Sequence, residues 1–342
     1  MKKIVISLFI LLGITLSLTA QSQEYTSREQ VAEDPVVLRD FNIQGEYAAL
    51  FNGETTGMNI IAEGDGKFKF VGFKGGLPGD GWKKGDDRVF GTITLKNDTE
   101  LEFTVNEMEE NGERKKVEFP SLTLKFEDGK LLPPAAFPDG PAMPRIERKS
   151  PTLGQKAPEG AIIIFDGESE GWLADGNKNE EAGTMWSEFT SKPLARKPYL
   201  LHAEFMLSFM PNARGQARSN SGVYLDESFE CQVLDSFGLE GEDNECGGIY
   251  TCRASKLNMC FPPLQWQTYD IEFVPPLYEG DRQTAPAYFR TVKLNGVLVQ
   301  ENVDRDRSTY GHKDASGEPR GVYFQGHGNK VQYRNIWVKY ID

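Results

Sequence analysis

The sequence predicts an all-β protein in which a small antiparallel β domain precedes a β-sandwich. Short runs rich in β-branched and aromatic residues recur along the chain, and turn residues such as Asn295 and Gly296 separate them. After Ala161 about ten such runs follow one another without a convincing amphipathic helix, which is typical of a sandwich. A chain of 342 residues is also long enough for about two domains.

The N-terminal residues 1–20 have the pattern of a secretory signal peptide. Lys2 and Lys3 precede an apolar run from Ile4 to Leu18, which is short for a membrane-spanning helix. No later segment approaches about 18 uninterrupted apolar residues, so we expect no membrane span. No cysteine follows the run, which argues against a lipid anchor. We therefore expect a soluble exported protein that is periplasmic or secreted.

Composition divides the remaining chain into four segments. Residues 21–38 are polar, and we expect a flexible N-terminal segment. Residues 39–131 hold short β-like runs separated by turns, which predict the small antiparallel β domain. Residues 132–158 contain many prolines and predict an extended linker, and residues 159–342 form the predicted sandwich.

The charge and the cysteines restrict the partners and the covalent framework. A net charge of −13 argues against nucleic acid, because phosphate binding needs clustered lysine and arginine. The four cysteines lie within thirty residues, and export permits disulfides. Three pairings of four cysteines are possible, and we favour one bridge, between Cys246 and Cys260. A zinc site is the alternative, although no C-x-x-C spacing occurs.

The sequence predicts no cofactor, and a divalent cation is the alternative for one acidic loop. Glu240, Glu242, Asp243 and Glu245 are clustered carboxylates of the kind that calcium binds in exported proteins. Their spacing does not match an EF-hand loop, so we favour a solvated acidic turn.

The segment from Arg214 to Ser236 carries the candidate site. With a period of two, Phe229, Cys231 and Val233 share the apolar face of a strand, while Glu230 and Gln232 share the other face. A hairpin turn after Leu225 would bring Asn220 and Tyr224 beside these two polar residues. Polar groups and an aromatic ring on one sheet face suit a sugar-sized ligand.

A series of short motifs in order resembles the family described as 3-keto-disaccharide hydrolases, over roughly residues 160–342. The motifs that carry the resemblance are Phe165-Asp166-Gly167, Gly171-Trp172, Leu201-His202-Ala203-Glu204-Phe205, Asn220-Ser221-Gly222-Val223-Tyr224-Leu225, Glu230-x-Gln232-Val233-Leu234-Asp235, Trp266-Gln267-Thr268-Tyr269, Leu294-Asn295-Gly296, His327-Gly328 and Arg334-Asn335-Ile336. The resemblance implies a concanavalin-like, or glucanase-like, jelly-roll sandwich. It also implies action on oxidised mono- or disaccharide glycosides, by 1,2-elimination from a 3-keto-glycoside and hydration of the resulting glucal.

The residues suggest how such chemistry could occur. A ketone at C3 acidifies the proton on C2, so a general base can remove it if the enolate is stabilised. We assign Glu230 as one proton-transfer group and His327 or Asp235 as the other. The expected substrate-binding residues are Asn220, Tyr224, Gln232, Trp266, Gln325 and Arg334.

Several alternatives remain open from the sequence. Asp235 could cap a turn, and Arg334 could form a structural ion pair across strands. A conventional glycosidase would need two carboxylates beside the bond, and Gln232 stands where the glucanase-type motif has an acid. A non-catalytic carbohydrate-binding module is the third possibility, because this fold hosts lectins as well as enzymes.

Overall fold

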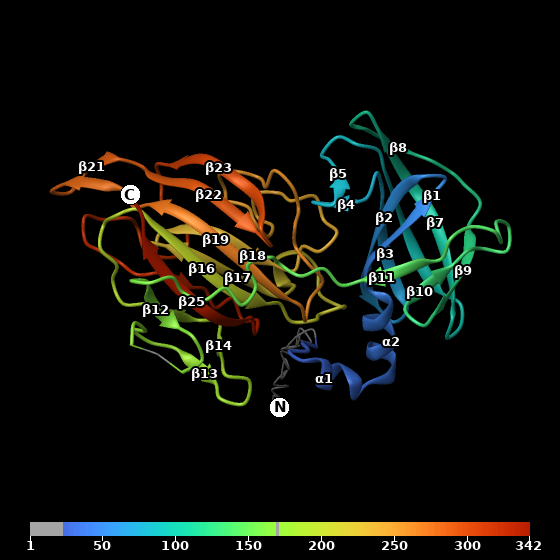
Figure 1. Ribbon diagram of the computed structural model, residues 1–342, viewed down its shortest axis with the longest axis horizontal. Helices are drawn as coiled ribbons and strands as arrows, with labels where there is room; N and C mark the ends of the chain where they lie inside the picture. The colour runs from blue at the N-terminus through green and yellow to red at the C-terminus, as the bar shows by residue number, and fades with distance from the viewer. Residues whose placement is uncertain (1–22, 169–170) are drawn as a thin grey trace, which may run out of the picture.

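The computed structural model describes residues 23–168 and 171–342, and it shows two β structures lying side by side (Figure 1). The predicted signal peptide, residues 1–20, lies outside the described residues. Within the described ranges, no helix has both the length and the apolar character needed to cross a membrane. The prediction of an all-β protein with a sandwich behind a small antiparallel β domain is confirmed.

The N-terminal structure is an antiparallel sheet closed into a barrel. Its nine strands run in the order β6-β3-β2-β1-β11-β10-β9-β7-β8, and β6 also pairs with β7, which closes the ring. The strands and short flanking elements are β1 (Gly45–Phe51), β2 (Glu54–Gly64), β3 (Lys67–Lys74), β4 (Leu77–Pro78), β5 (Gly81–Trp82), β6 (Arg88–Leu95), β7 (Glu100–Glu110), β8 (Glu113–Lys116), β9 (Leu122–Glu127), β10 (Lys130–Leu132) and β11 (Met143–Ile146).

Two segments differ from the sequence prediction. The segment expected to be flexible, residues 21–38, contains α1 (Arg28–Ala32) and the start of α2 (Pro35–Ile43). The Asp34 side chain accepts a hydrogen bond from the Val36 amide and caps α2, whose residues Phe41 and Ile43 are buried. The expected linker, residues 132–158, contributes β11, which pairs with β1 and β10. Burial of the barrel core therefore orders residues whose composition alone indicates irregular chain.

The C-terminal structure is a sandwich of two antiparallel sheets. The larger sheet has the order β13-β14-β25-β16-β19-β22-β23, with β12 beside β25, and the smaller has the order β15-β24-β17-β18. Their elements, with a small β20–β21 hairpin and one 3-10 turn, are β12 (Ile162–Phe165), β13 (Asn177–Asn179), β14 (Thr184–Trp186), β15 (Phe189–Thr190), β16 (Tyr199–Met206), η1 (Gly215–Ala217), β17 (Asn220–Leu225), β18 (Phe229–Leu234), β19 (Trp266–Val274), β20 (Leu277–Glu279), β21 (Arg282–Ala285), β22 (Ala287–Leu294), β23 (Val297–Arg305), β24 (Tyr323–Phe324) and β25 (Gln332–Tyr340).

The predicted strand faces and hairpins are confirmed. Phe229, Cys231 and Val233 of β18 lie in the apolar core between the two sheets. β17 and β18 pair as an antiparallel hairpin, from Asn220 opposite Leu234 to Leu225 opposite Phe229. The other polar face of β18 is therefore directed away from the core.

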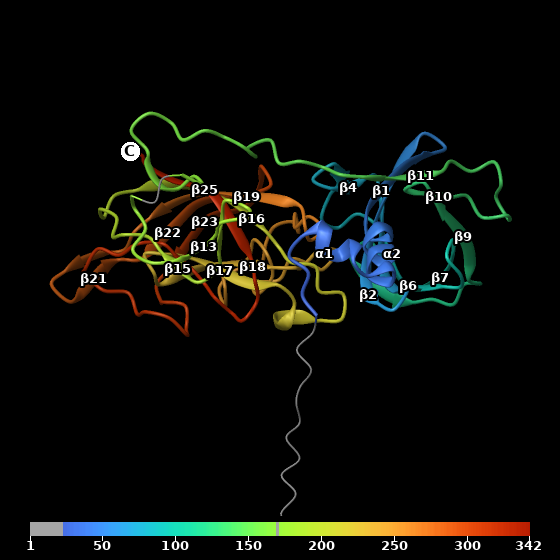
Figure 2. The ribbon, with the colours of Figure 1, turned by 90° about the horizontal axis from the view of Figure 1, so that it is seen from below.

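The barrel and the sandwich share one apolar junction. Phe209, which follows β16, and Leu264, which precedes β19, belong to the same buried cluster as the barrel core. The Phe209 ring meets that of Phe41 edge to face at 5.3 Å, and Tyr25 pairs with Phe209 through two backbone hydrogen bonds. Seen from below, α1 and α2 lie at this junction (Figure 2).

We expect Phe209→Ala to lower the free energy of unfolding by about 3–5 kcal/mol, because it leaves a cavity in the shared core. Calorimetry should show a lower Tm together with separated transitions for the barrel and the sandwich. Phe137→Ala is the matched control, since Phe137 is an exposed aromatic residue on the barrel side of the chain. An unchanged Tm for Phe209→Ala would show that the two structures do not depend on this contact.

Candidate functional site

An open pocket of about 350 Å³ lies over the outer face of the smaller sheet. This free volume falls within the range of ordinary small-molecule sites. The pocket brings together six of the residues selected from the sequence, namely Asn220, Tyr224, Glu230, Gln232, Gln325 and His327. Gln216, Tyr250, Tyr310, Gly311 and Gly326 complete its lining.

The strand register explains why the polar residues meet. Tyr224 of β17 lies opposite Glu230 of β18, and Gly222 lies opposite Gln232. A Cβ atom on Gly222 would stand 2.4 Å from Glu230 Oε1, so the missing side chain leaves the space that the carboxylate fills. Steric contact with Glu230 therefore explains why the Asn-Ser-Gly-Val-Tyr motif has a glycine at this position.

Glu230 is a buried carboxyl group on the floor of the pocket. Only 2% of the residue is exposed, and this burial raises the pKa of Glu230 to about 7, against a smaller lowering from its hydrogen bond with Tyr224. In the orientation that satisfies its neighbours, the Gln232 amide donates to Glu230 Oε1 at 2.6 Å. A carboxyl group with this pKa can both accept and release a proton near neutral pH.

Tyr224 and Gln325 extend the polar floor beside Glu230. Burial, followed by the nearby Glu230 charge, raises the pKa of Tyr224, so its phenol stays protonated. The Gln325 side-chain amide donates to the Tyr224 hydroxyl at 3.2 Å, and its backbone amide donates to the Gly222 carbonyl at 2.8 Å. The floor therefore presents hydroxyl and amide groups beside one carboxyl group.

Loops bound to β18 form the walls. The Tyr250 amide donates to the Glu230 carbonyl at 3.2 Å, and the Glu230 amide donates to Thr309 Oγ1 at 3.0 Å. On another side, Asn220 Nδ2 donates to the Gln216 carbonyl at 2.9 Å. His327 lies on the exposed rim. The walls thus restrict solvent at the Glu230 carboxyl group while the pocket stays open outward.

Sequence reasoning missed the residues that the loops supply, namely Gln216, Tyr250, Thr309 and Tyr310. None lies in a recognisable motif, and Tyr310 is separated from Glu230 by 79 positions that include β19 to β23. The one local signal is the aromatic residue beside a glycine at Tyr310-Gly311, a pairing that suits a loop but indicates no site by itself.

Asp235 is not part of this pocket, so its assignment as a proton-transfer group is corrected. Its carboxylate accepts from Arg218 Nε at 2.6 Å, and both side chains are buried. Arg218 also donates to the Ala62 carbonyl at 3.2 Å and to Gln44 Oε1 at 3.4 Å, both on the barrel side. Because β18 ends at Leu234, the chain turns Asp235 toward the junction, where it neutralises this arginine.

Trp266 and Arg334 are also absent from the pocket, which corrects their assignment to sugar binding. They belong to the larger sheet, where the Arg334 guanidinium carbon stands 3.9 Å from the centre of the Trp266 ring. Arg334 Nε donates to Glu204 Oε2 at 2.7 Å, across the pairing of β16 with β25. The structure thus supports the alternative of a cross-strand ion pair.

The predicted Cys246–Cys260 disulfide is not formed. All four cysteines are free thiols, and Cys246 and Cys260 are both buried. Cys246 Sγ also lies 3.4 Å from the Tyr269 hydroxyl, and Cys260 Sγ donates to the Leu234 carbonyl at 3.5 Å. Each thiol therefore has a polar partner without a covalent bond.

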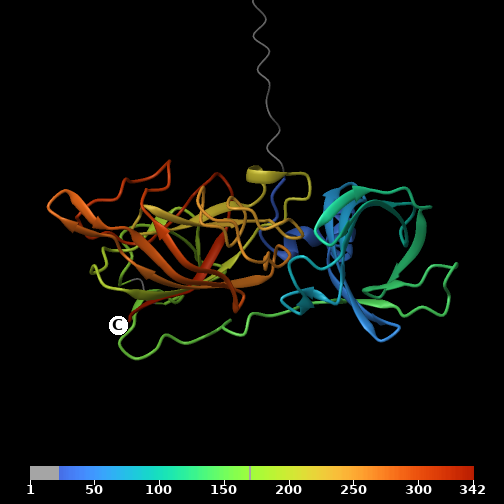
Figure 3. The same ribbon diagram turned by 90° about the horizontal axis from the view of Figure 1, so that it is seen from above.

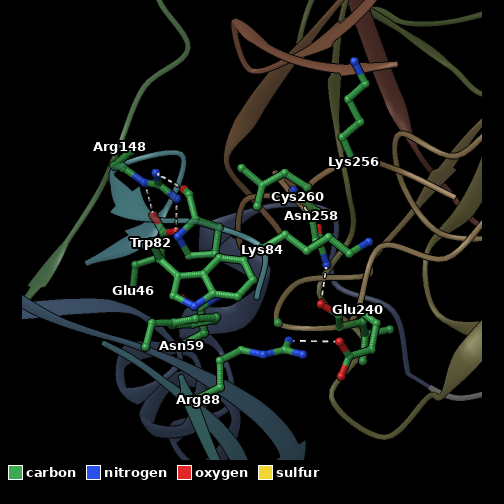
Figure 4. A pocket seen from close by; sticks show the side chains of 15 residues that line it. Glu46, Asn59, Trp82, Lys84, Arg88, Arg148, Glu240, Lys256, Asn258 and Cys260 are labelled. Carbon is green, nitrogen blue, oxygen red and sulfur yellow. Dashed lines mark hydrogen bonds and ion pairs between the residues drawn. The ribbon is translucent and has the colours of Figure 1, made fainter. Parts of the chain in front are cut away.

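One carboxylate of the acidic loop, Glu240, joins the two β structures, while Glu242 stays exposed to solvent. Glu240 pairs with Arg88 at 2.9 Å (Figure 4). Glu240 also pairs with Arg114, while Glu245 accepts from the Gly241 amide at 2.6 Å. The interface cavity in Figure 4 has only about 30 Å³ of free volume, enough for a water molecule and too small for a sugar. Across residues 23–168 and 171–342, no group of three or more His, Cys, Asp or Glu side chains is arranged so that it could hold a metal ion.

Two solved structures of candidate glycosyl hydrolases from Parabacteroides distasonis are similar to this chain. One is 22% identical with a TM-score of 0.47, and the match covers 54% of this chain and 86% of that chain. The other is 16% identical with a TM-score of 0.37, and the match covers 54% of this chain and 95% of that chain. A search of curated proteins finds no match.

The sequence profile of a family described as the 3-keto-alpha-glucoside-1,2-lyase-like domain matches residues 160–339. The matched range is more than half of the 342-residue chain, and it contains every residue that lines the pocket over Glu230. The chain therefore belongs to the 3-keto-alpha-glucoside-1,2-lyase-like family.

Proposed function

We propose that this protein is an enzyme that cleaves glycosides carrying a ketone at C3, with Glu230 as the general base. The observation that carries the proposal is the buried Glu230 carboxyl group, whose pKa is raised to about 7 in a pocket of amide, hydroxyl and aromatic groups. Family membership supports a glycoside as the substrate.

The first step is an elimination. The C3 ketone acidifies the C2 proton, and the Glu230 carboxylate removes it. Electrons from the C2–H bond form the C1=C2 double bond through an enolate, and the C1–O bond breaks with its electron pair on the leaving oxygen. The products are a 3-keto-glucal and the released alcohol, which requires one proton.

Neutral donors and the rim histidine complete this step. The Gln325 amide and the protonated Tyr224 hydroxyl lie beside the carboxyl group, where they can donate to the enolate oxygen. His327 on the rim is the candidate acid that protonates the leaving oxygen. In the second step, the oxygen of water adds to C1 and one of its protons passes to His327, while protonated Glu230 returns its proton to C2. The net outcome is hydrolysis.

The pocket composition separates this proposal from its two alternatives. A conventional glycosidase needs two carboxyl groups beside the scissile bond, whereas Glu230 is the single carboxyl group among the described residues that line this pocket. A binding module has no need of a carboxyl group whose pKa lies near neutrality. Both points favour proton transfer beside a carbonyl.

The direct test is to incubate the purified protein with p-nitrophenyl 3-keto-glucoside and, separately, with the unoxidised glucoside. We expect release of nitrophenol from the oxidised compound alone. Equal cleavage of both compounds would identify a conventional glycosidase. Binding without release from the oxidised compound would identify a binding module.

Glu230→Gln should abolish detectable turnover while stabilising the fold above pH 7. The folded-state pKa of about 7 exceeds the ordinary value of 4.5, so the stability that this group provides is complete below pH 4.5 and declines as the pH rises through 7. An amide avoids this loss, which is about 3 kcal/mol for a pKa raised from 4.5 to about 7. Thermal unfolding at pH 5 and pH 8 measures the difference.

The matched control for that variant is Glu279→Gln, because Glu279 is an exposed glutamate on β20. It should leave both turnover and Tm as in the original protein. Turnover by Glu230→Gln at the original rate would remove Glu230 from the mechanism. A lower Tm at pH 8 would show that its charge is not disfavoured by burial.

We expect kcat/KM for a 3-keto-glycoside to rise with pH, with a midpoint near 7, as Glu230 loses its proton. The value of kcat/KM rises with pH because a general base acts in its deprotonated form. Initial rates between pH 5 and pH 9 at low substrate concentration measure this profile. A kcat/KM that falls throughout this range, with no rising limb, would contradict the role of Glu230 as the base.

Gly222→Ala should lower kcat/KM by about 100-fold, because displacement of a catalytic group by about 1 Å has an effect of this size. The new Cβ would stand 2.4 Å from Glu230 Oε1 and 3.0 Å from Tyr224 Cε2. Gly171→Ala is the control, since no atom outside its chain neighbours lies within 4 Å of a Cβ there. Full activity in Gly222→Ala would mean that the carboxyl position is unimportant.

A further inference from the structure

Tyr310 is a pocket residue with an unusual exposure. Its relative exposure is 95%, compared with 63% for Phe137, and it is the most exposed large apolar or aromatic side chain in the described part of the chain. Glu230 on the floor of the same pocket is only 2% exposed. Tyr310 therefore lies at the outer end of the pocket and Glu230 at the inner end.

The backbone beside Tyr310 is fixed relative to Glu230. Thr309 is buried, its amide donates to the Ser228 carbonyl at 2.7 Å, and its Oγ1 accepts from the Glu230 amide at 3.0 Å. The bonds join the residue before Tyr310 to Ser228, directly before β18, and to Glu230, within β18. An exposed ring is thus attached to an ordered support.

The rest of the loop is also bound to the sandwich. Lys313 forms an ion pair with the buried Glu227, and the Ala315 amide donates to Ser308 Oγ at 2.7 Å. These contacts lie on both sides of Tyr310 in the sequence. The loop that presents the ring is therefore constrained along its length.

Aromatic side chains continue from this loop to the floor. The His312 ring stacks on Tyr323 with centroids 4.0 Å apart, and it meets Tyr224 edge to face at 5.4 Å. Gly311 has a φ of +100°, a conformation that residues with a Cβ rarely adopt, and it turns the chain between His312 and Tyr310. The same loop thus contributes one ring to this aromatic group and one to the rim.

We propose that Tyr310 binds the leaving group of the substrate, and that this group is a ring that stacks on the tyrosine. The inference rests on the function proposed above. With the oxidised sugar over Glu230, the sheet closes the inner side, so the rest of the glycoside has to extend toward the open side, where Tyr310 lies. A pyranose or an aryl ring both offer the flat apolar face that a tyrosine ring binds.

The test compares three 3-keto-glucosides whose leaving groups are methanol, a second pyranose and p-nitrophenol. Tyr310→Ala should lower the ratio of kcat/KM for each ring-bearing substrate to that for the methyl glycoside by about 3- to 10-fold. Tyr310→Phe should keep the original ratio, because it retains the ring. A loss with only one of the two ring-bearing substrates identifies which ring the residue favours.

Phe137→Ala is the control, because it removes another exposed aromatic side chain that lies outside the pocket. It should leave all three kcat/KM values unchanged. An unchanged ratio in Tyr310→Ala, or a change in Tyr310→Phe equal to that in Tyr310→Ala, would overturn the proposal.

Binding measurements separate this proposal from the proposed reaction. The Kd of each glycoside is measured by calorimetry with Glu230→Gln and with the same variant carrying Tyr310→Ala. If the original protein cleaves no 3-keto-glycoside, the proposed function fails. A selective 3- to 10-fold weakening of the ring-bearing ligands would still support the role of Tyr310, and equal Kd values would reject it.

Discussion

The site depends on the burial of the Glu230 carboxyl group against a sheet that leaves room for it. Removing a carboxylate from water is unfavourable, so its pKa rises and the group exchanges protons near neutral pH. Gly222 leaves the space, Tyr224 and Gln232 supply hydrogen bonds, and the apolar side of β18 holds the strand in place. The same strand therefore packs against the core with one face and lines the pocket with the other.

β18 is an edge strand of the smaller sheet, and the loops that form the pocket walls bind to the edge that none of the described strands pairs with. Unpaired backbone groups on an edge strand need partners. Here the segment from Gly247 to Tyr250 and the hydroxyl of Thr309 supply them. Because these bonds end on Glu230 and Gln232, the loops that enclose the pocket are fixed to two residues that line it.

Contact with the barrel explains why Asp235, a candidate catalytic residue in the sequence, has a structural role instead. It lies against one end of the sandwich, as the view from above shows (Figure 3), and it shares the buried cluster around Phe209. At this junction Asp235 neutralises Arg218, which donates to barrel groups. On the larger sheet, the guanidinium of Arg334 forms an ion pair with Glu204. A charge that already has a buried partner is poorly suited to bind substrate.

The sequence by itself determined the strand faces and the β17–β18 hairpin, because side-chain alternation and a short turn depend only on neighbouring residues. The same two features brought Asn220, Tyr224, Glu230 and Gln232 together. It did not determine α2 or β11, whose order comes from burial in the barrel. Nor could it separate Glu230 from Asp235, or place Tyr250 and Tyr310 on the walls. Those outcomes depend on where strand ends and distant loops meet in space, and only tertiary packing decides that.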